Sequence, residues 1–211
     1  MKPLSLSEYL KSPCSSASIP YWKQKNLILP KNIKIVHDND YVKNEFIDYI
    51  DEPYFRLYHD LKLIKHTDLN NIEIVTATVG LLDNFVEIIN ASYTDLSVTK
   101  EQIEGFTKTP VYRPDLWVLL RDKASGSFVG CGIADYDKNI GEMTLEWIQV
   151  IPSFRGKSYG SYIVNHLLSK MQGIAKFATV SGKVNNPTRP ENLYRKCGFT
   201  GEDIWHILYE K

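Results

Sequence analysis

From residue 71 onward, apolar and polar positions succeed one another in regular strand and helix patterns. Residues 72–76 alternate as in a half-buried strand, and residues 81–89 carry apolar side chains at helical spacing. Thr99 and Gln102 have the spacing of a capping box, which predicts the start of a second helix. Turn residues separate the next apolar runs, which predicts an antiparallel meander of strands at 116–120, 128–136 and 142–151.

The C-terminal part continues this succession. Apolar residues four positions apart predict a helix over residues 158–171, and Gly198 is placed to stop a shorter helix over 190–197. Strands are predicted at 177–181 and 204–209. The resulting order, β-α-α-β-β-β-α-β-α-β, is a mixed α/β arrangement without an internal repeat.

Residues 1–70 lack this regular succession. Ser5 and Glu8 have the spacing of a capping box, which predicts a short first helix, and residues 33–36 fit a short strand. We therefore expect an N-terminal extension, residues 1–70, that packs on a main domain formed by residues 71–211.

The end of this extension is aromatic and apolar. Pro53 suits the first turn of a helix, and the broad apolar face that follows it predicts a helix over residues 53–64. Within it, the segment 54–59 is expected to lie over the sheet and to shape a substrate pocket.

Composition excludes several classes of partner. The 25 basic and 25 acidic side chains of the 211 residues cancel, which disfavours a nucleic acid or a membrane held by bulk charge. No apolar run approaches the ~18 residues of a membrane span. The three cysteines and five histidines show no metal-ligand spacing, so no metal is expected. These features favour a cytoplasmic protein with reduced thiols.

One stretch, residues 150–161, carries the clearest chemical signal. An apolar run ends at Pro152, a basic turn with Arg155, Gly156 and Lys157 follows, and a helical pattern begins at once. The first main-chain N–H groups of a helix have no intrahelical acceptor, and the helix dipole favours negative charge there. The pattern therefore predicts a site for a phosphorylated ligand, and taken alone it suits a nucleotide as well as other phosphates.

Two segments carry a resemblance to a known family. Residues 145–160, Leu-Glu-Trp-Ile-Gln-Val-Ile-Pro-Ser-Phe-Arg-Gly-Lys-Ser-Tyr-Gly, resemble the acetyl-CoA-binding motif of the GNAT N-acetyltransferase superfamily. Residues 192–199, Asn-Leu-Tyr-Arg-Lys-Cys-Gly-Phe, resemble its second signature. The resemblance covers residues 72–211 and departs at Ser158, where the family has glycine.

The resemblance implies the fold and the coenzyme site. The expected fold is a mostly antiparallel central sheet flanked by helices, with splayed central strands that bind acetyl-CoA. The main chain of the turn would wrap the pyrophosphate, and the free backbone of the preceding strand would pair with the pantetheine arm. Either Asn185 or Asn186 would touch the coenzyme. The expected coenzyme-binding residues are thus Ile148, Gln149, Val150, Arg155, Gly156, Lys157, Ser158, Tyr159, Gly160, Ser161, Asn185 and Asn186.

Two residues are candidates for catalysis. Strand alternation would place Glu146 on the same face as Ile148 and Val150, where a carboxylate can accept a proton from the substrate ammonium. Its alternative role is to position that ammonium. Glu142, four residues earlier on the same expected face, or a water could serve as base instead. By the resemblance, Tyr194 would donate a proton to the leaving thiolate; its alternative role is to fill the space between helix and sheet.

The sequence thus predicts an acetyl-CoA-dependent N-acetyltransferase that acts on a primary amine by direct attack in a ternary complex. The acceptor would be a small molecule or a peptide, and the protein a monomer or homodimer. A catalytically silent acyl-CoA sensor or assembly module of the same fold is the alternative. A covalent cysteine route is not expected, because no histidine can be assigned beside Cys131 or Cys197.

Overall fold

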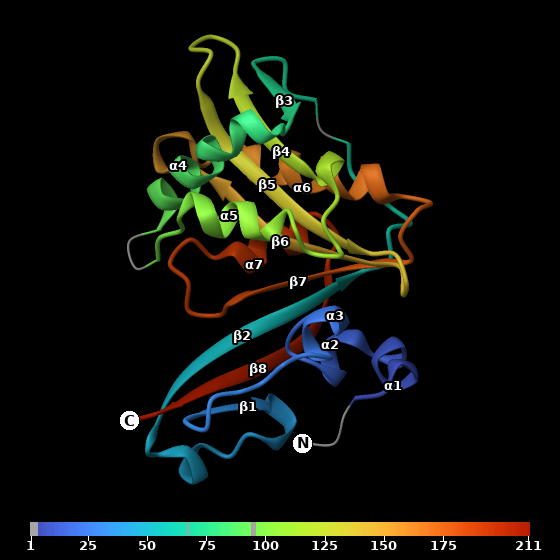
Figure 1. Cartoon of the computed structure of the whole chain (residues 1–211), viewed down its shortest axis with the longest axis vertical. Helices are drawn as coiled ribbons and strands as arrows, with labels where there is room; N and C mark the ends of the chain where they lie inside the picture. The colour runs from blue at the N-terminus through green and yellow to red at the C-terminus, as the bar shows by residue number, and fades with distance from the viewer. Residues whose placement is uncertain (1–3, 67, 94–95) are drawn as a thin grey trace. The chain divides into compact units, whose positions relative to one another are not determined.

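The structure, a computed structural model, describes residues 4–66, 68–93 and 96–211. The chain forms two compact units, and each is described by itself (Figure 1). The first unit comprises Met1–His59, Thr179–Arg195 and Phe199–Lys211, and the second comprises Asp60–Ala178 and Lys196–Gly198. Both units therefore combine segments from either side of residue 70. The division into an extension and a main domain at that position stays a prediction.

An antiparallel meander forms the sheet of the second unit. Its strands follow the spatial order β3-β4-β5-β6, with bounds Ile72–Thr76, Trp117–Asp122, Phe128–Asp137 and Glu142–Val150. The predicted strands and their antiparallel pairing are confirmed. β7 (Phe177–Lys183) begins in this unit, where the main-chain N–H of Lys176 donates to the carbonyl of Gly141, and it continues in the first unit.

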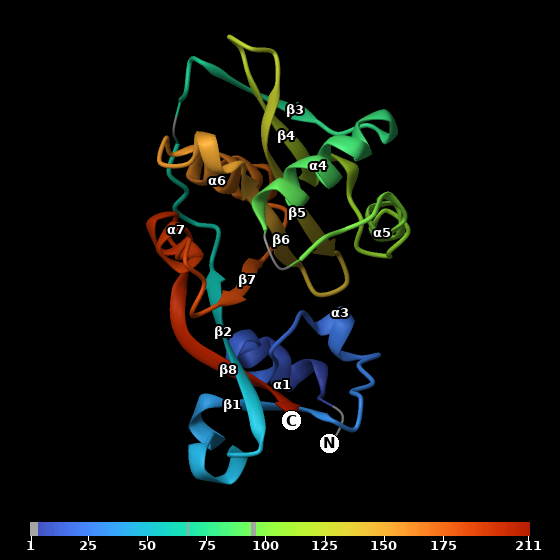
Figure 2. The ribbon, with the colours of Figure 1, turned by 90° about the vertical axis from the view of Figure 1, so that its left-hand side faces the viewer.

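Helices cover both faces of this meander (Figure 2). α4 (Leu82–Ser92) and α5 (Lys100–Phe106) lie on one face, and α6 (Tyr159–Met171) lies on the other. The predicted capping box at α5 is present, because the Thr99 hydroxyl accepts from the main-chain N–H of Gln102. The core on the α4 and α5 side contains the fully buried side chains Phe85, Ile89, Ile103, Trp117 and Leu119.

Close packing of α6 on β5 depends on two glycines. A Cβ atom at Gly132 would lie 2.4 Å from Cγ2 of Ile163, and one at Gly130 would lie 2.8 Å from the carbonyl oxygen of Gln149. Such distances are far inside van der Waals contact, so any side chain here would push the helix outward or distort the neighbouring strand. These glycines hold α6, and with it the turn that precedes it, close to the sheet.

In the first unit, β8 (Thr200–Glu210) lies between β1 (Ile33–His37) and β2 (Tyr49–His59), antiparallel to both. The order continues from β2 to β7. The helices of this unit are α1 (Leu6–Lys11), α2 (Pro13–Ser16), α3 (Tyr21–Gln24) and α7 (Pro190–Lys196). The capping box of Ser5 and Glu8 at α1 is confirmed. Short 3-10 turns in the two units span Asp38–Asp40, Lys43–Phe46, Val79–Leu81, Pro114–Leu116 and Pro152–Phe154.

The predicted helix over residues 53–64 is wrong, because most of this segment belongs to β2. The run Tyr54–His59 is rich in aromatic side chains, which pack well on a pleated sheet, and its register with β8 pairs Phe55 with Ile204. The expectation that residues 54–59 lie over the sheet is wrong for the same reason. They are part of the sheet itself.

The N-terminal helices are joined to one face of this sheet by a buried arginine. Arg56 of β2 is 1% exposed, and its guanidinium donates to the Tyr9 hydroxyl at 2.9 Å and to the Ser18 carbonyl at 3.2 Å. It also reaches the Thr179 hydroxyl of β7 at 3.4 Å. On the same face, the Trp205 indole donates to the Cys14 carbonyl at 2.8 Å. These polar contacts fix residues 9–18 on strands β2, β7 and β8.

None of the helices within the described part of the chain is both long and apolar enough to cross a membrane.

We predict that Arg56→Met lowers the free energy of unfolding by about 3 kcal/mol, because the buried hydroxyl and carbonyl groups lose a charged donor. Chemical denaturation measures this change. Arg121→Met is the matched control. Arg121 is 38% exposed and lies 3.6 Å from Glu73, so its loss should cost less than about 1 kcal/mol. Equal stability of the two variants would contradict the role given to Arg56.

Candidate active site

A β-bulge interrupts β6 at one of the predicted catalytic residues. Ile133 of β5 pairs with Trp147, whereas the next residue, Ala134, pairs with Leu145. Glu146 is therefore the extra residue of the bulge. Bulges re-aim side chains and increase the local twist of a strand. The strand is thus irregular at the carboxylate expected to act in catalysis.

The bulge also changes which side chains share a face. Beyond it, Ile148 lies opposite Gly132, on the side of α6, whereas Glu142 lies opposite Asp137 on the other side. The simple alternation that placed Glu142, Glu146 and Ile148 on one face is wrong, because it counts no extra residue. Glu142 is 1% exposed, while Glu146 is only partly buried. Of the two carboxylates, Glu146 is the one that solvent or substrate can reach.

Past the bulge, the side chain of Gln149 is held on the α4 side of the sheet. Its amide donates to the Tyr93 hydroxyl at 2.7 Å, and the Tyr93 ring meets Trp147 edge-on at 6.0 Å. The C-terminus of α4 is thereby fixed to the end of β6. Sequence reasoning missed Tyr93. This residue follows the last residue of α4, and the apolar pattern of the helix does not indicate a contact with β6.

The predicted anion-binding turn has a distinctive backbone. Gly156 has φ +79° and Ser158 has φ +62°, so both adopt the left-handed conformation. Ser158 is the N-cap of α6, yet its side chain makes no capping hydrogen bond. The first main-chain N–H groups of α6 are thus left without a side-chain acceptor, and left-handed residues in such turns form concave sites for anions. The geometry fits a phosphate group.

Arg155 braces this turn. Its guanidinium donates to the carbonyl of Val150 at 2.9 Å and to the carbonyl of Ser92 at 3.1 Å. The side chain therefore joins the end of β6 to the last residue of α4. Lys157 is exposed, with its ammonium 4.7 Å from the ring centroid of Phe154. This lysine adds positive charge beside the first N–H groups of α6.

The first residue of α6 has a structural role. Tyr159 is 3% exposed, and its hydroxyl accepts from the side-chain amide of Asn71 at 2.7 Å. Its main-chain N–H belongs to the uncapped first turn, as do those of Gly160 and Ser161. The predicted coenzyme contacts of these residues are therefore main-chain ones.

Tyr194 lies on α7, in the first unit. Its side chain is 7% exposed, and its ring centroid lies 6.2 Å from that of Phe55 and 5.8 Å from that of Phe199. These contacts fix the ring between α7 and strands β2 and β8. This packing is compatible with both roles considered for Tyr194, that of proton donor and that of space filler.

The two candidate asparagines differ in their surroundings. The Asn186 side-chain oxygen accepts from the main-chain N–H of Thr188 at 2.9 Å and from its hydroxyl at 2.8 Å. Such an Asx turn engages the side-chain oxygen of Asn186, while its amide nitrogen can still donate to a ligand. Asn185 is exposed. Either side chain could therefore donate to a ligand.

The cysteines and the possible metal ligands were the other candidates for chemistry. All three cysteines are buried, and burial raises the pKa of the Cys131 and Cys197 thiols, which disfavours the thiolate. No group of three or more His, Cys, Asp or Glu side chains in the described ranges is arranged to hold a metal ion.

Part of the chain is similar to a known family. Residues 113–201, which run from the turn before β4 to the start of β8, match the family model described as acetyltransferase (GNAT) domain. No curated protein sequence matches the chain.

Solved structures share the GNAT fold at low identity. A GCN5-related N-acetyltransferase from Sphaerobacter thermophilus is 17% identical, with a TM-score of 0.67 over 78% of this chain and 53% of that one. A conserved protein of unknown function from Staphylococcus epidermidis is 11% identical, with a TM-score of 0.63 over 98% of this chain and 81% of that one. The ribosomal-protein-S18-alanine N-acetyltransferase from Escherichia coli is 16% identical, with a TM-score of 0.52 over 65% and 91%. The chain thus spans about half the length of the Sphaerobacter protein.

We predict that Ser158→Gly raises the free energy of unfolding by about 1 kcal/mol, because glycine adopts positive φ without steric cost. The affinity for acetyl-CoA should stay unchanged, since the phosphate contacts proposed for this turn are main-chain ones. Thermal or chemical unfolding and calorimetric titration measure the two effects. Ser161→Gly, inside α6, is the control and should lower stability by about 0.5–1 kcal/mol. A loss of stability in Ser158→Gly would rule out a strained serine.

Proposed function

We propose that the protein is an acetyl-CoA-dependent N-acetyltransferase that transfers an acetyl group to a primary amine by direct attack in a ternary complex. The GNAT domain supports acyl transfer in general. The observation that carries the finer proposal is the left-handed turn at Gly156 and Ser158, which leads into α6 without a side-chain cap. A small-molecule or peptide amine is the proposed acceptor.

The residues of the turn suit the phosphates of coenzyme A. The main-chain N–H groups from Gly156 to Ser161 would hold the pyrophosphate, with Lys157 beside them and Arg155 keeping the turn in shape. The main chain of Ile148, Gln149 and Val150 would hold the pantetheine arm. Asn185 or Asn186 would supply a further side-chain contact through its amide nitrogen.

Two side chains would handle the protons of the reaction. The bound coenzyme supplies an acetyl group activated as a thioester. Glu146, partly open at the bulge, would take a proton from the substrate ammonium, directly or through a water, so that the amine can attack. Tyr194 would donate a hydrogen bond or a proton to the sulfur as the thiol leaves. The acetylated amine and the free thiol are the products.

Binding and turnover test this proposal separately. Acetyl-CoA should raise the melting temperature of the purified protein, and a panel of primary amines should include at least one that releases free thiol from it. Stabilisation by ATP but not by coenzyme A would overturn the proposal in favour of a nucleotide-binding protein. Stabilisation by acetyl-CoA without turnover on any amine would favour the silent sensor or assembly module.

We predict that Tyr194→Phe lowers kcat by about 10²-fold or more and leaves the acetyl-CoA affinity nearly unchanged, because only the hydroxyl is lost and the ring still packs on Phe55 and Phe199. Steady-state thiol release and calorimetry measure the two quantities. Tyr136→Phe is the control, since that hydroxyl donates to the Ile174 carbonyl in an exposed contact. An unchanged kcat in Tyr194→Phe would remove this residue from the mechanism.

Glu146→Gln should lower kcat at neutral pH by a similar factor, because an amide cannot accept the ammonium proton. If Glu146 acts as base, the loss shrinks as pH rises, since the free amine then needs no base. A loss that is constant with pH would instead favour a role in positioning the ammonium. Rates measured from neutral to alkaline pH distinguish the two.

A further inference from the structure

The second unit contains a hollow of about 170 Å³ between α6 and the chain segment that precedes β3. Residues 60–66 and 68–71 of this segment run beside the helix (Figure 2). The side chains that line the hollow carry polar groups, among them those of Lys65, Asp68, Tyr162, Asn165, His166 and Ser169. Since a water takes about 30 Å³ of liquid volume, the hollow has room for a molecule of roughly six to ten non-hydrogen atoms.

The spacing of residues along α6 explains its polar wall. Ile163 and Leu167 face Gly132 of the sheet and are fully buried. Residues three and four positions apart share a helix face, so residues 162, 165, 166 and 169 fall together on the opposite side. Such a face normally meets solvent, yet Asn165 is only 5% exposed. The segment before β3 therefore turns an outer helix face into a lined site.

Hydrogen bonds hold this segment beside the helix. The side-chain amide of Gln172, directly after α6, donates to the carbonyl of Leu61 at 3.1 Å. At the other end, Asn71 donates to the hydroxyl of the first residue of α6 at 2.7 Å. Between them, the ammonium of Lys65 donates to the carbonyl of Lys196 at 2.7 Å. The wall of the hollow is thus fixed at both ends and near its middle.

Two polar side chains at the hollow lack hydrogen-bond partners. Among the described residues, neither Oδ1 of Asn165 nor Nε2 of His166 has one, and both atoms are closed to solvent. Burying an amide oxygen without a partner costs free energy, so packing alone would favour an apolar residue at position 165. The terminal amide can turn about χ2, which exchanges its oxygen and nitrogen, so it can meet a donor or an acceptor. A polar ligand is the missing partner.

Lys65 and Asp68 bring one charge of each sign to the lining. The hydrogen bond of Lys65 goes to an uncharged carbonyl, and within the described ranges the two side chains form no ion pair with each other. Burial, and then the charge of Lys170, lower the pKa of His166, so this ring adds no positive charge at neutral pH. A ligand that matches the lining therefore carries both an anionic and a cationic group.

We propose that the hollow binds a free α-amino acid with a small polar side chain. Lys65 pairs with its carboxylate and Asp68 with its ammonium, while Asn165 and the hydroxyls of Tyr162 and Ser169 bond its remaining polar groups. Serine, threonine, asparagine and glutamine fall within the size that the hollow admits. None of the lining residues takes part in the proposed acetyl transfer, so the two proposals are independent.

Calorimetric titration of the full chain without acetyl-CoA tests binding. At least one of L-serine, L-threonine, L-asparagine and L-glutamine should bind with a Kd below about 1 mM. Analogues that lack the ammonium or the carboxylate, for serine 3-hydroxypropionate and ethanolamine, should bind at least about tenfold more weakly. Failure of all four amino acids to bind, or equal binding of either analogue, would overturn the proposal.

Charge variants locate the bound amino acid. Lys65→Met and Asp68→Asn should each lower its affinity at least about tenfold. Lys62→Met is the matched control and should keep the affinity, because Lys62 is 81% exposed and lies 3.6 Å from Asp60. Unchanged affinity in both Lys65→Met and Asp68→Asn would place the amino acid elsewhere, as at an acceptor site for acetyl transfer, and would refute the assignment.

Asn165→Leu separates binding from folding. This variant should lower the amino-acid affinity at least about tenfold and raise the midpoint of chemical denaturation, because an unpaired buried oxygen is removed. A lower midpoint would show that the amide serves the fold and would count against the site. Acetyl-CoA should bind this variant as it binds the unaltered chain and should not displace the amino acid. Displacement would assign the hollow to the coenzyme instead.

Discussion

The close approach of α6 to β5 is the constraint on which the candidate site depends. Gly130 and Gly132 leave no side chain between helix and strand, so α6 packs closely on β5. Residues 151–158 connect β6 to α6, and Gly156 and Ser158 of this connection have left-handed backbone. The position of the turn, and of the first N–H groups of α6 that suit an anion, therefore depends on this packing. A bulkier residue at Gly132 would displace them even though it is part of the core.

Much of the second unit could be predicted from the sequence because short-range signals mark where its helices and strands begin and end. Capping boxes mark the starts of helices, and turn residues separate strands that alternate cleanly. The wrong prediction concerned residues 53–64, where aromatic and aliphatic side chains occupy both faces and fit either period. Only pairing with β8, which begins about 140 residues further along the chain, determines that Tyr49–His59 is a strand. Periodicity within a window cannot report a partner so distant.

Only the part of the candidate site that depends on local sequence could be predicted. Motif residues around Gly156 lie where a strand-turn-helix was expected, since that signal is local. The bulge at Glu146 was not predictable, because it is an offset between two strands and leaves no mark in either one alone. The hydrogen bonds that Arg155 makes to Ser92 and Gln149 to Tyr93 are equally invisible in sequence. They join residues that are 63 and 56 positions apart in the chain.

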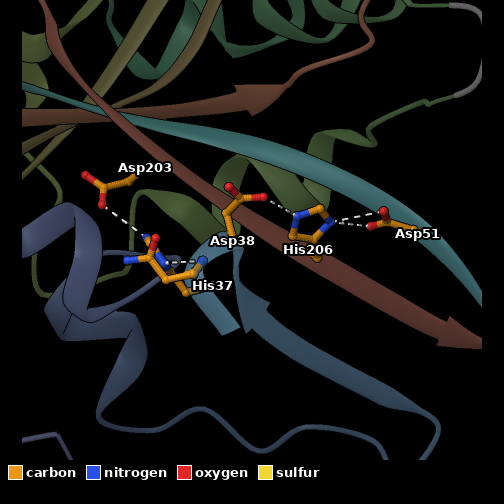
Figure 3. Close-up of polar contacts among 6 residues, drawn as sticks. His37, Asp38, Asp51, Asp203 and His206 are labelled. Atoms are coloured by element: carbon orange, nitrogen blue, oxygen red, sulfur yellow. Dashed lines mark hydrogen bonds and ion pairs between the residues drawn. The ribbon is translucent and has the colours of Figure 1, made fainter. Parts of the chain in front are cut away.

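In the first unit, hydrogen-bonded side chains of the strands hold segments of the N-terminal region in place. Arg56 on one face and His206 on the other, where its ring contacts Asp38 and Asp51 (Figure 3), each hold a segment of the N-terminal region to strands that come from the far end of the chain. An apolar contact would tolerate sliding of these segments, whereas a hydrogen-bonded guanidinium or imidazole is satisfied in one register only. Desolvating polar groups is costly, so such contacts are weak as sources of net stability. Their contribution here is specificity: they decide which part of the N-terminal region lies on which strand.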